Sequence, residues 1–262
     1  MRKTLLAAAV LSAFASANVA MAADPAPAAA PAVTGNAGVF SDYRFRGISQ
    51  TFMQPAFQGG FDYAHASGFY VGNWNSNVSG VQYANGAGLE MDFYGGFKTE
   101  VAGVGLDVGT LYYYYPGSEY TTSAEKYDNH EVYVGASFGP VSAKVSYAVS
   151  DYFGLNDKTA TTAAGDSNGT TYVELNFSKE VMPKLTLSAH VGQTKVKNYK
   201  DYDYTDYKVG VGYDVSGFVF GLAYVGNNVK SAGKSFYTAT NGNNKVEKLY
   251  DGGAVVSVSK TF

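Results

Sequence analysis

The sequence predicts an all-β protein that forms a single transmembrane, antiparallel, up-and-down β-barrel of about twelve strands. Three observations support this fold class: polar and apolar residues alternate in many segments, short and long links alternate between those segments, and aromatic residues gather near the segment ends. The composition agrees, because 23 tyrosines, 16 phenylalanines and 31 glycines accompany a mean hydropathy of −0.13. The chain is too aromatic for a disordered protein and too polar for a bundle of membrane helices.

Residues 89 to 98 show the clearest alternation. Leu89, Met91 and Phe93 fall on one face of a strand, whereas Glu90 and Asp92 fall on the other, because successive side chains of a strand point to opposite faces. A helix would scatter these carboxylates around its axis. The segments predicted as strands in the same way are Val39–Phe45, Phe57–Tyr63, Phe69–Val78, Leu89–Lys98, Val104–Tyr114, Val132–Phe138, Val141–Val149, Val173–Phe177, Leu185–Val191, Tyr207–Tyr213, Phe218–Tyr224 and Ala254–Phe262.

The links between these segments are alternately short and long. Short links contain turn-forming residues such as Ser67-Gly68 and Gly139-Pro140, whereas long polar links cover residues such as 116–129, 152–170 and 227–252. Bacterial outer-membrane barrels have an even number of strands, short periplasmic turns and longer outer loops. Twelve strands would therefore leave both termini on the periplasmic side.

Outward-facing aromatic residues are predicted at both ends of the strands. Membrane barrels concentrate aromatic side chains at the two interfaces between lipid and water. Phe69 and Phe138 are among those predicted near the periplasmic ends, and Phe57 and Tyr147 are among those predicted near the outer ends. A soluble β-sandwich, in which these rings would fill the core, is the alternative fold.

Three regions are predicted along the chain. Residues 1–22 have the features of a cleaved secretory signal peptide, because Arg2 and Lys3 precede a short apolar run that ends in small residues. Residues 23–35 are rich in alanine and proline, which predicts an extended periplasmic tail. Residues 36–262 are predicted to form the barrel. Its last residue, Phe262, resembles the C-terminal signature read by the machinery that assembles outer-membrane barrels, an expected partner.

The first half of the predicted barrel resembles the TorF family of porins. The similarity is carried by residues 41–50 (SDYRFRGISQ), 55–63 (PAFQGGFDY) and 67–77 (SGFYVGNWNSN), and further along the chain by Glu90, Asp92, Tyr94, Asp107 and Glu131. The second half resembles the family only in its rhythm of strands and loops. The resemblance implies an outer-membrane barrel with a channel role, and it implies no particular substrate.

The polar face of each strand is predicted to line the lumen. A charged side chain that faces lipid at mid-depth costs about 2–4 kcal/mol, so this many charges on one face require water or partners. We expect arginines on one wall and carboxylates on the other. The predicted pore-lining residues are Arg44, Arg46, Asp62, Glu90, Asp92, Lys98, Asp107, Glu131, Lys144, Glu174, His190 and Lys208. With Asp42, which is also predicted to point inward, seven acids face five bases, which predicts a weak preference for cations.

The predicted function is a porin-like channel in the outer membrane of a Gram-negative bacterium. Small hydrophilic solutes or ions would diffuse passively through the charged lumen, and outer-membrane lipids would surround the barrel. Two alternatives remain open. The lumenal charges could form salt bridges that plug a narrow barrel, since twelve strands lie between the filled eight-stranded barrels and the open barrels of 16 to 18. The tyrosine- and asparagine-rich outer loops could instead serve adhesion around a closed barrel.

Other function classes find little support in the sequence. It contains no cysteine and only three histidines, and none of these lies in a recognisable nucleophile motif, although His190 follows Ser188 by two residues. We therefore expect no enzymatic activity. The acidic and amide residues of the loops lack calcium-loop spacing, so neither a metal nor another cofactor is expected. The formal net charge of −3 makes nucleic acid an unexpected partner.

Overall fold

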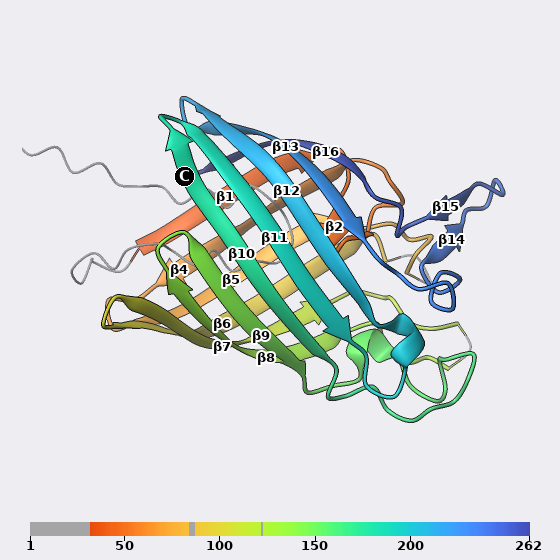
Figure 1. The fold of residues 1–262 in the computed structure, drawn as a ribbon. Coiled ribbons are helices and arrows are strands. Elements are labelled where there is room, and N and C mark those ends of the chain that lie inside the picture. The colour runs from red at the N-terminus through yellow and green to blue at the C-terminus, as the bar shows by residue number, and fades with distance from the viewer. Residues whose placement is uncertain (1–31, 84–86, 122) are drawn as a thin grey trace, which may run out of the picture.

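The computed structural model describes residues 32–83, 87–121 and 123–262, and across these residues twelve antiparallel strands close into one barrel (Figure 1). The predicted signal peptide, residues 1–22, and residues 23–31 of the predicted tail lie outside the described residues. The barrel strands are β1 (Ala32–Phe40), β4 (Ala56–Ala64), β5 (Phe69–Asn77), β6 (Leu89–Val101), β7 (Val104–Tyr114), β8 (Asn129–Phe138), β9 (Val141–Ala148), β10 (Thr171–Met182), β11 (Leu185–Lys195), β12 (Tyr204–Val215), β13 (Phe218–Asn227) and β16 (Gly253–Thr261).

The barrel closes where β1 pairs with both β4 and β16. Val39 lies opposite Phe57 of β4 on one side and opposite Val258 of β16 on the other. The backbones of Gly35 and Phe262 exchange two hydrogen bonds, of 3.0 and 2.8 Å. Each remaining barrel strand pairs with the barrel strands that precede and follow it along the chain. The predicted all-β class, the closed antiparallel barrel and the number of strands are therefore confirmed.

The first strand is displaced from its predicted position. Alternation predicted a strand over Val39–Phe45, but β1 ends at Phe40, and residues 32–35 belong to β1 rather than to a tail. Ala32 to Gly35 pair with Ala64 to Phe61 of β4, so backbone hydrogen bonds to a distant strand order a segment whose composition predicted an unpaired chain. An unpaired edge here would leave the barrel open.

The exterior of the barrel is apolar. Leu89 and Phe93 are 40% and 45% exposed on the outside, whereas Glu90 and Asp92 on the same strand are 1% and 0% exposed on the inside. The same division holds on other strands, as in β13, where Phe218, Phe220, Leu222 and Tyr224 are exposed and Val219 and Ala223 are buried. On β6 and β13, the side chains of one face therefore lie inside the barrel, and the large apolar side chains of the other face lie outside.

The two ends of the barrel differ. One end, here called the turn end, carries the short links such as Ala102-Gly103 and Ser216-Gly217, together with Ala32 and Phe262 (Figure 1). The opposite end, here called the loop end, carries the long links, the hairpin of β14 (Thr238–Thr240) and β15 (Val246–Lys248), and the short 3-10 helices η2 (Tyr152–Gly154) and η3 (Lys200–Tyr202). Among the described residues, no helix has the length and apolar character needed to cross a membrane.

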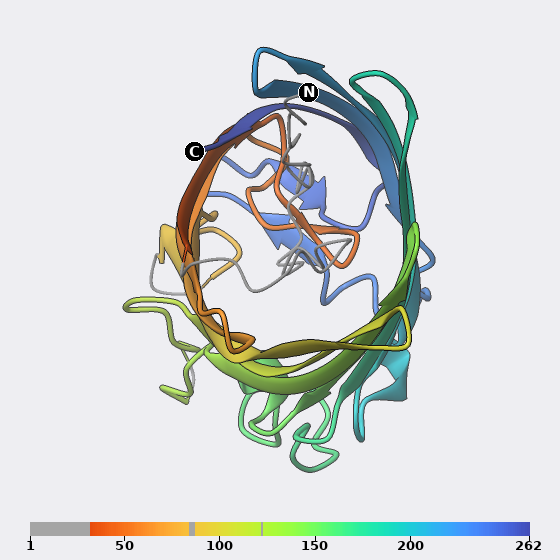
Figure 2. The ribbon, with the colours of Figure 1, turned by 90° about the vertical axis from the view of Figure 1, so that its left-hand side faces the viewer.

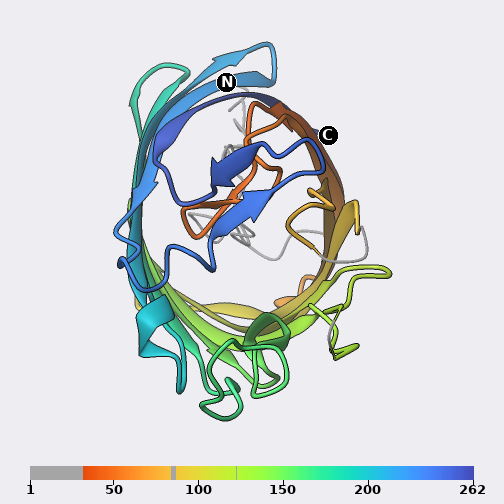
Figure 3. The ribbon, with the colours of Figure 1, turned by 90° about the vertical axis from the view of Figure 1, so that its right-hand side faces the viewer.

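Residues 41–55, here called the lumenal loop, turn into the barrel instead of extending away from it. Figures 2 and 3 show this segment in orange within the ring of strands. It contains a small hairpin of β2 (Arg44–Phe45) and β3 (Ile48–Ser49), joined by a two-residue turn in which Arg46 and Gly47 have φ angles of 46° and 80°. Positive φ at both turn positions is typical of type I′ hairpins.

Inside the barrel, tyrosine rings lie over glycines of neighbouring strands. A side chain at Gly96 would meet the Tyr70 hydroxyl, and one at Gly192 would overlap the Tyr172 ring. Tyr94 lies over Gly72 and Tyr133 over Gly109 in the same way. Glycine at these positions leaves room for large side chains inside a twelve-strand circle.

Candidate functional site

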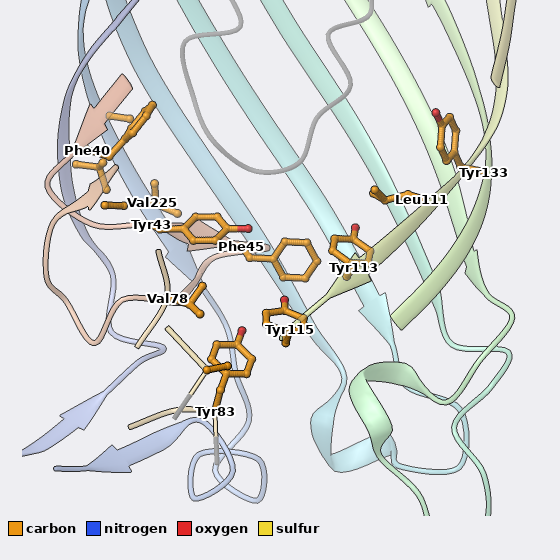
Figure 4. Close-up of a cluster of buried hydrophobic side chains, with 14 residues drawn as sticks. Phe40, Tyr43, Phe45, Val78, Tyr83, Leu111, Tyr113, Tyr115, Tyr133 and Val225 are labelled. Carbon is orange, nitrogen blue, oxygen red and sulfur yellow. The ribbon is translucent and has the colours of Figure 1, made fainter. Parts of the chain in front are cut away.

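Aromatic packing around the lumenal loop fills part of the lumen near the loop end. Phe45 makes an edge-to-face contact with Tyr113, with ring centroids 5.5 Å apart (Figure 4). It makes a second such contact with Phe153 at 5.6 Å. Tyr43 makes a similar contact with Trp74 at 5.4 Å and is completely buried. The loop is therefore packed against the wall rather than suspended in solvent.

Arg46, at the tip of the lumenal hairpin, binds the far wall. Its Nη2 lies 2.8 Å from Oε2 of Glu131 on β8, and its Nη1 donates to the Tyr152 hydroxyl at 3.1 Å. Its guanidinium lies over the Tyr172 ring, 4.0 Å from the centroid. Burial opposes the charge on Arg46, but Glu131, Tyr152 and Tyr113 together favour it and raise the pKa of Arg46 well above its usual value.

Arg44, on the other side of the hairpin, stabilises the loop from within. Its Nε donates to Asp42 at 2.5 Å, and its Nη1 donates to the carbonyl of Asp251 at 2.7 Å. Asp42 also accepts hydrogen bonds from the hydroxyls of Ser49 and Thr51, at 2.7 and 2.9 Å. The carboxylate of Asp42 thus organises the hairpin, and Arg44 joins it to the long link that precedes β16.

Two long loops hold the lumenal loop from the loop end. The amide of Ser49 donates to the carbonyl of Leu249 at 2.9 Å, and the amide of Ser79 donates to the carbonyl of Gln50 at 2.8 Å. The hydroxyl of Tyr83 also donates to the side chain of Gln50. The lumenal loop is therefore held inside the barrel by the β13–β16 link and the β5–β6 link, which are both distant from it in sequence.

These contacts correct the predicted placement of the two arginines. Arg44 and Arg46 do not lie on a wall of the barrel; they lie on a loop inside it, and Arg46 reaches Glu131 directly. Residues 42 to 46 alternate in polarity, which is typical of a wall strand with one face toward lipid and one toward the lumen. In the structure both faces of this segment are buried inside the barrel. A cue in the sequence was Arg46-Gly47, a possible two-residue turn.

A belt of charged side chains lines the wall on neighbouring strands, here called the charged belt and made of Lys98, Asp107, Lys144, Glu174, His190, Asp206 and Lys208. Lys144 Nζ lies 2.9 Å from Glu174 Oε1, and Lys98 Nζ lies 4.0 Å from Asp107 Oδ2. Lys98 and Asp107 are register partners across β6 and β7, and Glu174 and Lys144 are register partners across β9 and β10. Opposite charges thus occupy adjacent positions across paired strands.

His190 is bonded through both ring nitrogens. Its Nδ1 lies 2.6 Å from Asn176 Oδ1, and its Nε2 lies 2.9 Å from Asp206 Oδ1. Ser188 does not join His190, because its hydroxyl donates to the carbonyl of Gly210. Sequence reasoning missed Asp206, since it began the strand at Tyr207, whereas β12 begins at Tyr204 and places Asp206 on the same face as Lys208.

Asp62 lies on β4, nearer to the turn end than the lumenal loop is. Its Oδ1 accepts a hydrogen bond of 2.6 Å from the Tyr94 hydroxyl. Asp107 accepts one of 2.7 Å from the Tyr70 hydroxyl, and Lys98 lies over the Tyr70 ring at 4.6 Å. The Lys98 side chain is 33% exposed, in contrast to the 5% of Arg46, so the lumen is wetter toward this end.

Glu90 and Asp92 form the least satisfied part of the lumen. Glu90 Oε1 accepts a hydrogen bond of 3.0 Å from Tyr43, but Glu90 Oε2 and both oxygens of Asp92 have no hydrogen-bond partner among the described residues. Buried carboxylates normally have partners, so these two weaken the local packing. Within the described part of the chain, no group of three or more His, Asp or Glu side chains is placed to hold a metal ion.

A small polar cavity separates the lumenal loop from the wall formed by β11 to β13. It measures about 30 Å³ and is lined by Asp42, Arg44, Arg46, His190, Asp206 and Lys208, together with Phe40 and Val225. One water needs at least about 10–15 Å³ of such space, so the cavity is wide enough for about two waters. The structure thus brings six charged or titratable side chains together around one small cavity.

Comparisons with known proteins give a family and several structures of related form. A family model described as "Bacterial protein of unknown function (Gcw_chp)" matches residues 24–262. No curated protein matches the sequence significantly. Similarity to the TorF family is not shown by these comparisons.

Several solved porin structures are similar to the chain. A structure described as "KdgM porin" is 9% identical with a TM-score of 0.48, and 88% of this chain and 98% of that chain are covered. The NanC porin is 9% identical with a TM-score of 0.46 and the same coverage. OccD3 of Pseudomonas aeruginosa is 9% identical with a TM-score of 0.40, over 89% of this chain and 65% of that chain. At these identities and TM-scores, a shared substrate does not follow from the likeness.

Proposed function

Since the chain belongs to the Gcw_chp family, whose description assigns no function, we propose from its own residues that it is an outer-membrane channel narrowed by the lumenal loop. Ions and small hydrophilic solutes diffuse through a path beside that loop. The observation that carries the proposal is the reversal of polarity across one wall: an exposed apolar exterior encloses a charged, hydrogen-bonded lumen. Only a lipid exterior and a hydrated interior suit both faces.

The orientation follows from the unequal links. Short turns face the periplasm in outer-membrane barrels, so the turn end is periplasmic and the loop end is extracellular. Phe262, at the turn end and 68% exposed, is available to the barrel assembly machinery. The neighbouring Lys260 lies over the Phe218 ring at 4.3 Å, which allows its charge to remain at the interface.

The path is narrow because the lumenal loop occupies the loop half of the barrel. The polar cavity beside the loop admits about two waters, so small ions pass and larger solutes require a displaced loop. Asp206 adds an eighth acid to the seven predicted, against the five bases, so we expect a weak preference for cations.

Single-channel recording in planar bilayers tests the proposal. Refolded protein should show small conductance steps with weak cation selectivity. A variant in which residues 42–54 are replaced by a short Gly-Ser turn should show larger steps, because Phe40 and Ala56 are register partners that a short turn can join. If the unaltered protein shows no steps, the channel proposal is wrong and a closed barrel that acts through its outer loops replaces it.

A further inference from the structure

All the long loops contribute to an aromatic pocket at the loop end, above the lumenal loop. Its walls come from the lumenal loop (Phe45), the β5–β6 link (Gln82, Tyr83), the β7–β8 link (Tyr120), the β9–β10 link (Phe153), the β11–β12 link (Tyr202) and the β13–β16 link (Phe236). These segments are far apart in sequence, and their loops surround the same mouth of the barrel (Figure 3), where they line one pocket. Because six segments contribute to it, the pocket is a feature of the whole loop end and not of a single loop.

The chemistry of the pocket is narrow. Ten of its sixteen lining residues are aromatic, and none is charged. Two pairs of rings lie face to face: Tyr202 and Phe236 stack with centroids 4.4 Å apart, and Tyr120 and Tyr127 stack at 4.1 Å. Other rings of the pocket, such as Phe236 and Tyr237, meet edge to face. Flat rings of this kind offer broad apolar faces to a flat ligand. Phe236 is 44% exposed, so its stack is open to a ligand that arrives from outside.

One polar atom on the wall lacks a partner. Oε1 of Gln82 is buried and accepts no hydrogen bond from any described residue, although the Gln82 amide nitrogen donates to Gln50 at 3.3 Å. A buried acceptor without a donor is unfavourable, so a ligand that supplies a hydroxyl improves the site. A purely apolar ligand would leave this oxygen unsatisfied, and a charged ligand would find no counter-charge.

We propose that this pocket binds a single neutral sugar ring. The apolar C–H faces of a pyranose stack on the aromatic side chains, and a ring hydroxyl donates to Gln82 Oε1. The cavity of about 160 Å³ lies below the roughly 300–1,000 Å³ of drug-sized sites, so it suits one ring rather than a long oligosaccharide. The lumenal charges lie beneath the pocket and take no part in binding, so the sugar site is distinct from the proposed ion path.

Saturation-transfer NMR on protein refolded in a detergent without a sugar headgroup tests the proposal directly. The probe is methyl β-D-glucopyranoside, and the comparison probes are glucuronate, which adds a carboxylate to the same ring, and phenol. We expect transfer to the ring C–H protons of the glucoside and little transfer to glucuronate. Because binding is measured without flux, failure of the channel proposal would leave this result unaffected.

Two substitutions localise the binding to this pocket. Phe236→Ala removes one face of an exposed stack, and we expect it to weaken binding about threefold to tenfold. Gln82→Met preserves the size of the side chain but removes the acceptor, and we expect a loss of similar size. Phe57→Ala, on the outer wall of the barrel, is the matched control and should leave binding unchanged.

Three results would overturn the proposal: no transfer to the glucoside, equal transfer to glucuronate, or transfer to phenol alone. Equal binding by the parent protein and both pocket variants would place the sugar elsewhere and would also overturn it. Loss of binding in both variants with retention in the control would support it. Heat-dependent gel mobility, which reports barrel folding, distinguishes a folded variant from a failed one.

Discussion

The most informative perturbation is Arg46→Met, which removes the charge that joins the lumenal loop to the wall. Methionine keeps much of the apolar stem of arginine but loses the 2.8 Å contact with Glu131 and the 3.1 Å contact with Tyr152. Among the described residues, the Glu131 carboxylate then keeps Asn129 at 3.2 Å and Tyr113 at 3.5 Å as hydrogen-bond donors. The variant should therefore loosen the loop while leaving the strand pairing intact.

The size of the effect follows from burial. The Arg46 and Glu131 side chains are 5% and 3% exposed, so solvent does not screen the charge that is left behind. Removal of one partner of a buried ion pair costs about 3–5 kcal/mol, which corresponds to about a 100- to 5,000-fold shift in an equilibrium constant. We assign this cost to local opening of the loop, because the pair joins the loop to the wall and not one wall strand to another.

Thiol labelling measures that opening, since the chain has no cysteine of its own. Ile48→Cys places a reporter on the lumenal hairpin, where the native side chain is 3% exposed. Labelling by a hydrophilic maleimide then requires opening, and its rate follows the opening equilibrium when the loop closes faster than the thiol reacts. Arg46→Met in this background should raise the rate about 100-fold or more. Thr161→Cys in an exposed loop gives the unprotected rate.

A second substitution distinguishes the effect of the unpaired Glu131 charge from the effect of losing the packing of the Arg46 side chain. Adding Glu131→Gln to Arg46→Met neutralises the stranded carboxylate and should restore much of the protection, as expected for coupled residues. Lys158→Met, which removes the exposed pair of Lys158 with Glu125, should change the rate little. Labelling of Arg46→Met at a rate within about threefold of the parent, or labelling of the double variant as fast as the single one, would contradict this role of the buried pair.

Three further predictions concern stability. Asp92→Asn replaces an unpartnered buried acid, so it should raise the free energy of unfolding by about 1–3 kcal/mol, measured by urea titration of liposome-embedded protein. Asp62→Asn is the control and should bring no such gain, because the Asp62 carboxylate already accepts a hydrogen bond from Tyr94. Gly192→Ala should lower the free energy of unfolding by about 1–3 kcal/mol, because a side chain there overlaps the Tyr172 ring. Gly212→Ala, where there is more space, should lower it by less. Equal losses would contradict the packing of tyrosine rings over glycines. Burial raises the pKa of Tyr43 well above 10.0, and Glu90 adds to the shift, so the folded chain keeps a proton that the unfolded chain loses and stability should fall as pH rises above about 10. Tyrosinate absorbance should then appear in two stages, and a single stage near the usual tyrosine pKa would refute this.

Much of the barrel was predictable because its information is local. Alternation along Leu89–Lys98 assigned the inward and outward side chains correctly, since a strand has a period of two whatever its partners are. The short and long links gave the correct number of strands for the same reason, because turn residues act within a few positions. The charged wall residues, such as Lys144 and Glu174, followed from the same alternation.

The lumenal loop could not be predicted, because its conformation depends on contacts made across the barrel. Residues 42 to 46 alternate like a wall strand, yet Arg46 pairs with Glu131, a residue 85 positions away. Residues 32–35 resemble a free tail, yet their pairing with β4 orders them.

A twelve-strand barrel with an apolar outside and a charged inside can therefore be predicted from the sequence, because periodicity and turn chemistry are properties of neighbouring residues. The tertiary structure was needed to show that Arg46 pairs with Glu131, that a loop narrows the lumen, and that six loops line one aromatic pocket. Those features depend on contacts across the lumen between residues that are distant in sequence, and the residue pattern along one strand does not specify which residues lie on the opposite wall.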